Sequence, residues 1–214
     1  MDRISAVPIA AADSNEDAEP EAPADEKLML AYAAGDTAAF ERLYDRHERP
    51  VFRFLLRSVG NTAVAEELLQ EVWLAVVRNA ARYQPQAAFR TWLYRIARTR
   101  LIDHWRAREP AIVLSLDAPA GSDPDATGPT LGETIVGDES QQPLQRVMAM
   151  AQAQALLAAV HALPAPQREV FLLHAEGELT LAQIAEVAGV GFETAKSRLR
   201  YALDKLRAVR REWQ

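Results

Sequence analysis

The 214-residue chain contains no cysteine, which excludes a disulfide framework, thiolate zinc sites and cysteine nucleophiles. It also lacks an uninterrupted apolar run of roughly 18 or more residues, the length that a membrane-spanning helix requires. The first residues have neither a basic start nor a long apolar core, so we expect no signal peptide. These absences predict a cytoplasmic protein that does not insert into a membrane.

The motifs of common catalytic sites are missing as well. The sequence has no complete phosphate-binding loop, no G-x-G-x-x-G and no G-x-S-x-G. Its four histidines, His47, His104, His161 and His174, are scattered without the spacing of metal ligands. We therefore expect a protein that is not an enzyme, with no catalytic residue, no metal and no cofactor.

Charge is distributed unevenly along the chain, whose formal net charge is −6. Residues 1–26 carry eight acids and one arginine, and residues 110–145 carry six acids and no base. Residues 27–109, by contrast, carry 14 bases and nine acids. Because the basic charge lies on segments that are expected to fold, the acidic total does not argue against nucleic-acid binding.

Two acidic segments divide the chain. Residues 1–25 have few large apolar side chains and are expected to form a disordered N-terminal extension. Residues 110–143, with five prolines and four glycines, are expected to form a flexible acidic linker. Two small helical domains remain, residues 26–109 (the N-terminal unit) and 144–214 (the C-terminal unit). No alternating strand pattern occurs, so the predicted class is all-α.

Apolar residues at helical spacing predict eight helices. In the N-terminal unit they cover residues 26–34, the segment from a cap at Asp36 to Gly60, residues 62–81 and residues 88–108. In the C-terminal unit they cover residues 144–162, 166–176, 181–188 and 192–211. The helix over 88–108 is expected to bury a stripe that includes Phe89, Trp92 and Trp105.

The last two predicted helices have the features of a helix-turn-helix. Thr180 and Gln183 have the spacing of a capping box, and Gly189 can supply a left-handed turn. A stripe from Phe192 through Leu199 to Leu206 is expected to be core, and residues 192–211 carry seven bases against two acids. This pattern indicates a recognition helix for the DNA major groove. The alternative is a helical hairpin with a solvated basic face.

A second basic segment lies between Arg78 and Arg108, where eight arginines accompany a single acid, Asp103. Aromatic residues are interleaved with these arginines. Single-stranded DNA is bound by such combinations, because bases stack on rings while cations follow the phosphates. The competing interpretation is that the rings belong to the hydrophobic core.

Both basic segments resemble those of a known family. The stretches AEELLQEVW (65–73) and FRTWLYRIARTR (89–100), together with residues 36–61, resemble the second conserved region of the extracytoplasmic-function (ECF) sigma factors of the sigma-70 superfamily. Residues 163–207, which include LTLAQIAEVAGVGFETAKSRLR, resemble their fourth region. The two blocks occur in the family's order, with a linker between them.

The resemblance implies three groups of functional residues. The −35 set, which contacts the promoter's −35 element, is Thr194, Lys196, Ser197, Arg198, Arg200 and Tyr201. The −10 set, which recognises and melts the −10 element, is Arg82, Tyr83, Arg90, Trp92, Tyr94, Arg95, Arg98, Arg100 and Arg106. The polymerase-docking set is Glu66, Glu67, Leu69, Gln70, Glu71 and Trp73.

The partners implied by the resemblance are core RNA polymerase, through its β′ clamp helices and β flap, promoter DNA and an anti-sigma factor. The expected function is to direct core polymerase to specific promoters. One rival is a conventional activator or repressor that binds duplex DNA as a dimer. A second rival is a helical adaptor that never touches DNA.

Overall fold

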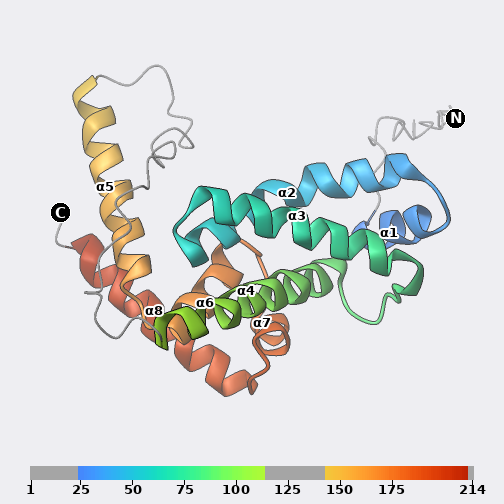
Figure 1. Cartoon of the computed structure of the whole chain (residues 1–214). Helices are drawn as coiled ribbons and strands as arrows, with labels where there is room; N and C mark the ends of the chain where they lie inside the picture. The colour runs from blue at the N-terminus through green and yellow to red at the C-terminus, as the bar shows by residue number, and fades with distance from the viewer. Residues whose placement is uncertain (1–23, 114–142, 212–214) are drawn as a thin grey trace, which may run out of the picture.

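The computed structural model describes residues 24–113 and 143–211. Within these ranges the chain is helical, without strands, which confirms the all-α prediction. The elements are α1 (Asp25–Ala33), α2 (Thr37–Val59), α3 (Thr62–Asn79), the 3-10 turn η1 (Ala80–Arg82), α4 (Phe89–Val113), α5 (Pro143–His161), α6 (Ala165–Ala175), α7 (Leu181–Ala188) and α8 (Phe192–Arg211) (Figure 1). The expected extension over 1–25 and linker over 110–143 lie almost entirely outside the described residues.

Local capping signals set most helix boundaries at the expected residues. The Asp36 carboxylate accepts hydrogen bonds from the backbone N–H of Ala38 (3.0 Å) and Ala39 (3.3 Å). The Asn61 side chain accepts one from Val64 N–H (3.1 Å), which starts α3. Between these helices Gly60 has a left-handed φ of 73°, a conformation that costs glycine little and closes α2.

Helix α4 is longer than predicted. It was expected to end near residue 108, ahead of Pro110, but it continues to Val113. A proline inside a helix removes one backbone hydrogen bond and usually kinks or ends the helix, but here the helical backbone continues for three residues beyond Pro110. Pro50 inside α2 is a second case in this chain.

Helix α1 is held to the N-terminal unit by the two acids of its first turn. Asp25 contacts Arg46 (Nη1 to Oδ1, 2.9 Å) and the buried His47 (Nε2 to Oδ2, 2.7 Å) on α2. Glu26 accepts a hydrogen bond from the backbone N–H of Phe89 (2.7 Å) at the start of α4. These two carboxylates therefore connect three helices.

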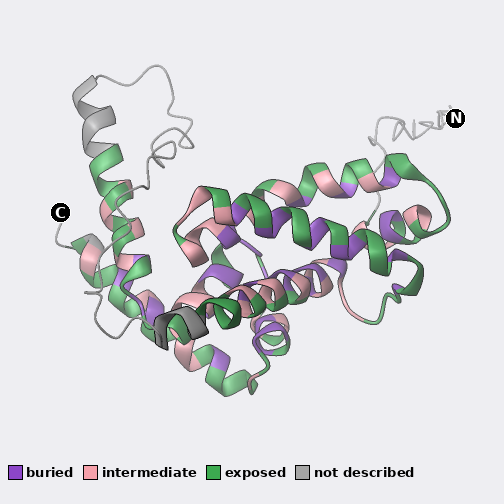
Figure 2. Cartoon of the chain, in the orientation of Figure 1, coloured by how far each residue is buried: buried purple, intermediate pink, exposed green. Residues whose placement is uncertain are grey.

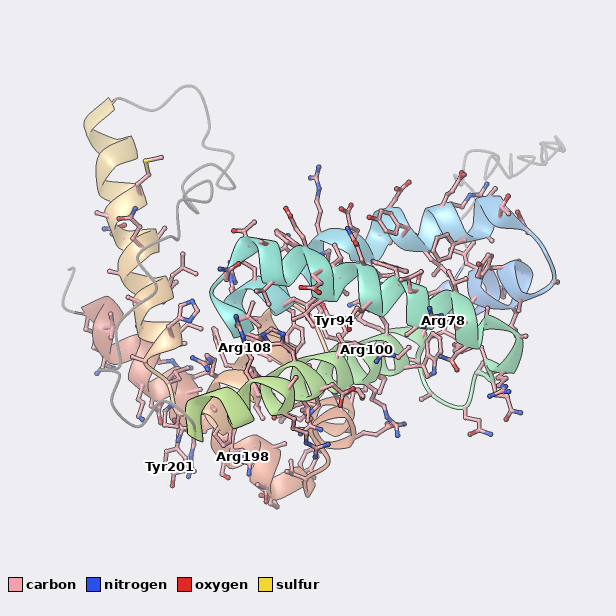
Figure 3. All side chains as sticks on the ribbon, in the orientation of Figure 1. Arg78, Tyr94, Arg100, Arg108, Arg198 and Tyr201 are labelled. Atoms are coloured by element: carbon pink, nitrogen blue, oxygen red, sulfur yellow. The ribbon has the colours of Figure 1, made fainter. Side chains whose placement is uncertain are left out.

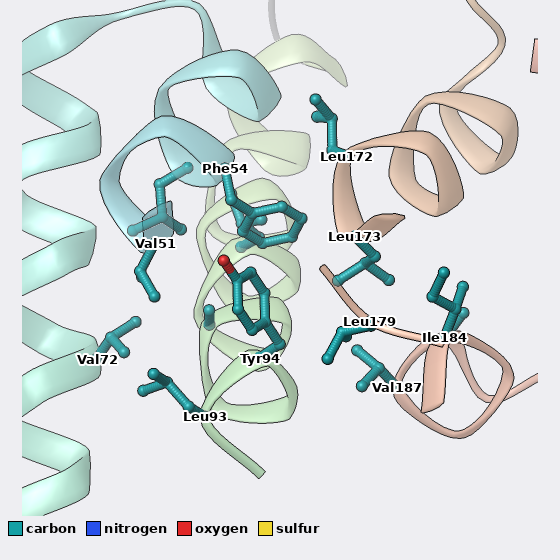
Figure 4. Close-up of a cluster of buried hydrophobic side chains, with 14 of the residues drawn as sticks. Val51, Phe54, Val72, Leu93, Tyr94, Leu172, Leu173, Leu179, Ile184 and Val187 are labelled. Atoms are coloured by element: carbon teal, nitrogen blue, oxygen red, sulfur yellow. The ribbon is translucent and has the colours of Figure 1, made fainter. Parts of the chain in front are cut away.

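The two helical units pack against each other, which the sequence did not predict. Helix α4 lies between them and contacts α3 on one side and α7 on the other (Figure 1). One continuous core contains Val51, Phe54 and Leu93 from the N-terminal unit together with residues of the C-terminal unit; Leu172, Leu173, Leu179, Ile184 and Val187 are the latter (Figure 4). We call this contact region the seam.

Tyr94 occupies the middle of the seam and is 1% exposed. Its ring packs edge-on against Phe54 (centroids 5.3 Å apart), and its hydroxyl donates to the backbone carbonyl of Glu176 (3.0 Å). Gly177 follows at close range, since a Cβ added there would lie 3.2 Å from Tyr94 Cζ and 2.6 Å from the Leu173 carbonyl oxygen. Only a residue without a side chain fits this approach.

Two expected core residues are exposed instead. Trp105 is 41% exposed, because it lies towards the C-terminal end of α4, where it lines a cavity beside α6 instead of being covered by another helix. Phe192 is 48% exposed and is the first residue of α8, at the end of the buried stripe. Ala195, Leu199, Ala202 and Leu206 of that stripe are buried as expected, while Leu203 and Val209 are half-buried. Figure 2 shows how buried and exposed residues are distributed over the helices.

Asp25→Asn should destabilise the fold in a pH-dependent way. The hydrogen bond from His47 is the largest influence on the pKa of Asp25; with Arg46 it outweighs burial and holds this pKa at about 2, below the usual 3.8. The stabilisation is therefore present above about pH 4 and is lost as pH falls through about 2. We expect wild type to exceed the variant by about 1–2 kcal/mol in unfolding free energy at pH 7, with the gap closing in acid. An equal gap at pH 7 and pH 2 in denaturant titrations would contradict this, and Asp45→Asn is the control.

Tyr94→Phe should weaken the seam while keeping its packing. The variant retains the ring but removes the hydroxyl donor, so the buried Glu176 carbonyl loses its partner. The expected loss is about 1 kcal/mol of unfolding free energy, measured by chemical denaturation. Tyr201→Phe removes an exposed hydroxyl and should change nothing; equal stability of both variants would count against the buried hydrogen bond.

Candidate nucleic-acid interface

The helix-turn-helix is built as its sequence predicts. The Thr180 hydroxyl accepts from Gln183 N–H (3.4 Å), and the Gln183 side chain accepts from Thr180 N–H (2.8 Å), which completes the capping box. Gly189 takes a left-handed φ of 66°, and Val190 N–H bonds the Ala185 carbonyl (3.0 Å). The turn therefore fixes α8 across α7.

The −35 set forms one continuous surface on α8. Thr194, Lys196, Arg200 and Tyr201 are exposed, while Ser197 and Arg198 are half-buried. The Arg200 guanidinium lies 5.1 Å from the centre of the Tyr201 ring. Figure 3 shows Arg198 and Tyr201 on α8 near the C-terminal end of α4. This surface offers the hydrogen-bond donors and cations that duplex DNA requires.

The arginines of the −10 set divide into two groups. Arg82 and Arg106 are exposed, and Arg100 lies 3.8 Å from Asp103 of the same helix. Three others on α4 pair with carboxylates of the C-terminal unit. These pairs are Arg90 with Glu178 (2.8 Å), Arg95 with Glu186 (3.2 Å) and Arg98 with Glu169 (2.7 Å). Sequence spacing offered no sign of these partners.

The aromatic members of the −10 set are largely core. Tyr83 and Tyr94 are buried, and Trp92 is half-buried. Tyr83, Phe89 and Trp92 form a cluster with ring centroids 5.0 to 6.1 Å apart. Burial, followed by the carboxylates of Glu26 and Asp25, raises the pKa of Tyr83 to about 12. In this conformation Tyr83 and Tyr94 offer no open face on which a base could stack.

The polymerase-docking set is an exposed polar face with apolar support. Glu66, Glu67, Gln70 and Glu71 are exposed on α3. Leu69 and Trp73 are buried instead, and the Trp73 ring packs on Phe40 (5.7 Å) and Tyr44 (4.9 Å). These two residues position the face rather than present it.

Sequence reasoning missed two apolar residues beside this face. Leu74 and Val77 are 51% and 41% exposed. They follow Gln70 at helical spacing, so they extend the same side of α3. The available signal was the presence of two apolar residues on the side of the helix that carries Gln70.

Two further arginines pair with the most buried carboxylate of the seam. Arg53 Nε lies 2.6 Å from Glu176 Oε2, and Arg57 pairs with the other oxygen of the same carboxylate. Glu176 is only 6% exposed. Burial, and then the neighbouring Arg53, lowers the pKa of Arg57. A carboxylate buried to this extent requires such partners.

Two further kinds of feature are absent from the part of the chain that the structure describes. No group of three or more His, Cys, Asp or Glu side chains in residues 24–113 and 143–211 could hold a metal ion. No described helix is long and apolar enough to cross a membrane.

Comparisons with known proteins agree with these features. Residues 43–110 match the family model for Sigma-70 region 2, and residues 159–208 match the model for Sigma-70, region 4. The chain is 32% identical over 190 residues to the ECF RNA polymerase sigma factor SigL of Mycobacterium tuberculosis, covering 84% of this chain and 93% of SigL. It is 33% identical over 175 residues to ECF RNA polymerase sigma factor RpoE of Cereibacter sphaeroides, covering 80% and 86%.

Solved structures share the fold. The sigma factor RpoE in complex with the anti-sigma factor NepR from Bartonella quintana matches with a TM-score of 0.62 at 19% identity, covering 80% of this chain and 96% of that one. CnrH in complex with the cytosolic domain of CnrY matches with a TM-score of 0.58 at 22% identity, covering 87% and 97%. With both region models and relatives of this similarity along most of its length, the chain belongs to the ECF sigma factors of the sigma-70 family.

Proposed function

We propose that this protein directs core RNA polymerase to specific promoters and acts stoichiometrically, without catalysis of its own. The observation that carries the proposal is the presence of two basic helices, α4 and α8, in one chain, each within its own family region. A conventional activator needs the helix-turn-helix but has no use for an arginine-rich α4. The proposal places the protein in the cytoplasm with the polymerase.

The two units take different parts of the promoter in this proposal. Helix α8 enters the major groove of the −35 element with the −35 set facing the bases. The arginines of the −10 set hold the phosphates of the −10 element as its strands separate. Two patches on one chain also explain how a small protein fixes both position and direction on DNA.

The face of α3 completes the assembly. We assign Glu66, Glu67, Gln70 and Glu71 to contact with the polymerase β′ clamp helices, and the C-terminal unit to contact with the β flap. Acidic groups that face a basic surface accelerate association and orient it. We also assign an anti-sigma factor as the regulatory partner, as family membership implies.

Arg198→Ala should strongly reduce promoter-specific initiation. Run-off transcription is measured with purified protein, sigma-free core polymerase and a pool of promoter fragments. Losing one base- or phosphate-contacting arginine costs about 1–3 kcal/mol, so initiation should fall roughly tenfold or more. Arg207→Ala is the matched control, since Arg207 lies on the same helix, is exposed and pairs with Asp204 (3.2 Å).

Three outcomes decide between the candidates. Defined start sites that are lost in Arg198→Ala and retained in Arg207→Ala support the proposal. No initiation, together with tight dimeric binding to duplex DNA without polymerase, supports an activator or repressor. Equal activity of both variants removes the assignment of Arg198.

Glu67→Lys should weaken binding to core polymerase. Reversing one exposed charge at a complementary interface lowers the association rate and affinity, here by about tenfold. The measurement is competition for core polymerase against the fluorescently labelled wild-type protein. Glu41→Lys carries the same charge change on exposed α2; equal losses in both variants would show a general charge effect and contradict the docking assignment.

A further inference from the structure

The acids of the C-terminal unit have an unusual set of partners. Between Leu163 and Gly191 the chain has four acidic residues, and every one pairs with an arginine of the N-terminal unit. These residues are Glu169, Glu176, Glu178 and Glu186. The two acids of α8, by contrast, pair within their own helix, Glu193 with Lys196 and Asp204 with Arg207.

The arginines in these pairs lie on one face of the N-terminal unit. Arg90, Arg95 and Arg98 come from α4, and Arg53 and Arg57 come from α2. We call these five residues the arginine face. Three of them belong to the −10 set, whereas Arg53 and Arg57 have had no role assigned.

A carboxylate and a DNA phosphate satisfy an arginine in the same way. Both are anions whose oxygens accept charge-assisted hydrogen bonds from the guanidinium. Each of the four glutamates therefore engages guanidinium donors that a phosphate could also engage. While the seam is closed, these arginines are neutralised and the face is covered by α6 and α7, so strand binding and closure exclude each other.

The DNA-contacting helix of the C-terminal unit is also confined by the seam. Arg198 of the −35 set lines the same cavity of about 360 Å³ as Arg98 and Trp105 of α4. The −35 and −10 elements, as their names state, lie about 25 base pairs apart, or roughly 85 Å along the duplex. Side chains that line one small cavity cannot contact both elements at once.

The chain has enough length to separate the units. Twenty-nine residues connect Val113 to Pro143. Fully extended, a segment of this length spans about 100 Å. The length of the connecting segment therefore permits the two units to separate.

We propose that the seam is an autoinhibitory contact in which Glu169, Glu176, Glu178 and Glu186 compete with promoter DNA for the arginine face. The inference rests on the proposed function and extends it: Arg53 and Arg57 join the phosphate-contacting surface once the seam opens. Exposed ion pairs such as Arg95–Glu186 are individually weak and salt-sensitive, which suits a contact that must be reversible.

The first test weakens the lock. In Glu169→Gln/Glu186→Gln two carboxylates are neutralised, each of which pairs with one α4 arginine. The free variant should bind a fluorescein-labelled 20-nucleotide single-stranded DNA about fivefold more tightly than wild type. Glu41→Gln/Asp45→Asn makes the same change in net charge on exposed α2 and should bind as wild type does. Equal affinities for the two double variants would overturn the proposal.

The second test holds the lock shut. Ser58 on α2 and Ala165 on α6 both line the seam cavity and belong to no proposed binding set. Because the chain has no cysteine, Ser58→Cys/Ala165→Cys can be joined specifically by a bismaleimide whose spacer contains a reducible disulfide. The cross-linked protein should not initiate run-off transcription with core polymerase, and reduction of the spacer should restore initiation.

The outcomes separate the two levels of the argument. A cross-linked protein that initiates as well as the reduced one would overturn autoinhibition and leave the proposed function intact. Failure to cross-link in free protein would show that the seam is not closed, and would overturn it as well. If the protein with unlinked cysteines and the wild type both fail to initiate, the proposed function itself fails and the inference falls with it.

Discussion

The buried carboxylate of Glu176 is the interaction on which the arrangement of the two units depends. It lies between Arg53 and Arg57, and its own backbone carbonyl accepts the Tyr94 hydroxyl. A buried ion pair contributes little net stability, because desolvation offsets the Coulomb attraction, but it is costly to leave half-formed. Glu176 therefore specifies one docking geometry more than it strengthens the contact, and the neighbouring Gly177 leaves room for the Tyr94 ring.

The seam combines apolar packing with ion pairs that can be exchanged. Phe54, Tyr94, Leu172 and Leu179 lie in a shared core. Four glutamates of the C-terminal unit, Glu169, Glu176, Glu178 and Glu186, pair with the arginine face. Separating the units exposes both kinds of surface. The arginines can exchange carboxylate for phosphate, but the apolar residues need another covering surface. Core polymerase is a protein large enough to cover these apolar residues, whereas DNA is not. In this account the seam therefore opens when the protein assembles with polymerase.

Local signals explain which parts of the fold could be predicted. The caps at Asp36, Asn61 and Thr180 and the left-handed glycines Gly60 and Gly189 act within a few residues, so the sequence alone located those helix ends. The predicted C-terminal end of α4 was wrong because Pro110 was expected to end the helix, whereas the helix continues through it. The predicted burial of Trp105 and Phe192 was wrong. Helical spacing shows on which side of a helix a residue lies, but not whether another element covers it there.

The site was predicted in composition more than in arrangement. The resemblance to the ECF sigma factors implied the −35, −10 and polymerase-docking sets, which stay predictions at the level of individual residues. The pairing of Glu176 with Arg53 joins residues 123 positions apart, and that of Glu169 with Arg98 joins residues 71 positions apart. No periodicity within one helix reports such contacts. The burial of Tyr83 and Tyr94 likewise depends on how α4 packs against its neighbours.

The most direct test of the account is the distance between the two units, free and in the initiation complex. Spin labels at Glu41→Cys on α2 and Ala208→Cys on α8 can be placed specifically, because the native chain has no cysteine. Double electron–electron resonance should give one narrow distance for free protein and a clearly different, longer distance when core polymerase and promoter DNA are bound. An unchanged distance in an active complex would contradict the claim that the closed seam must open for function.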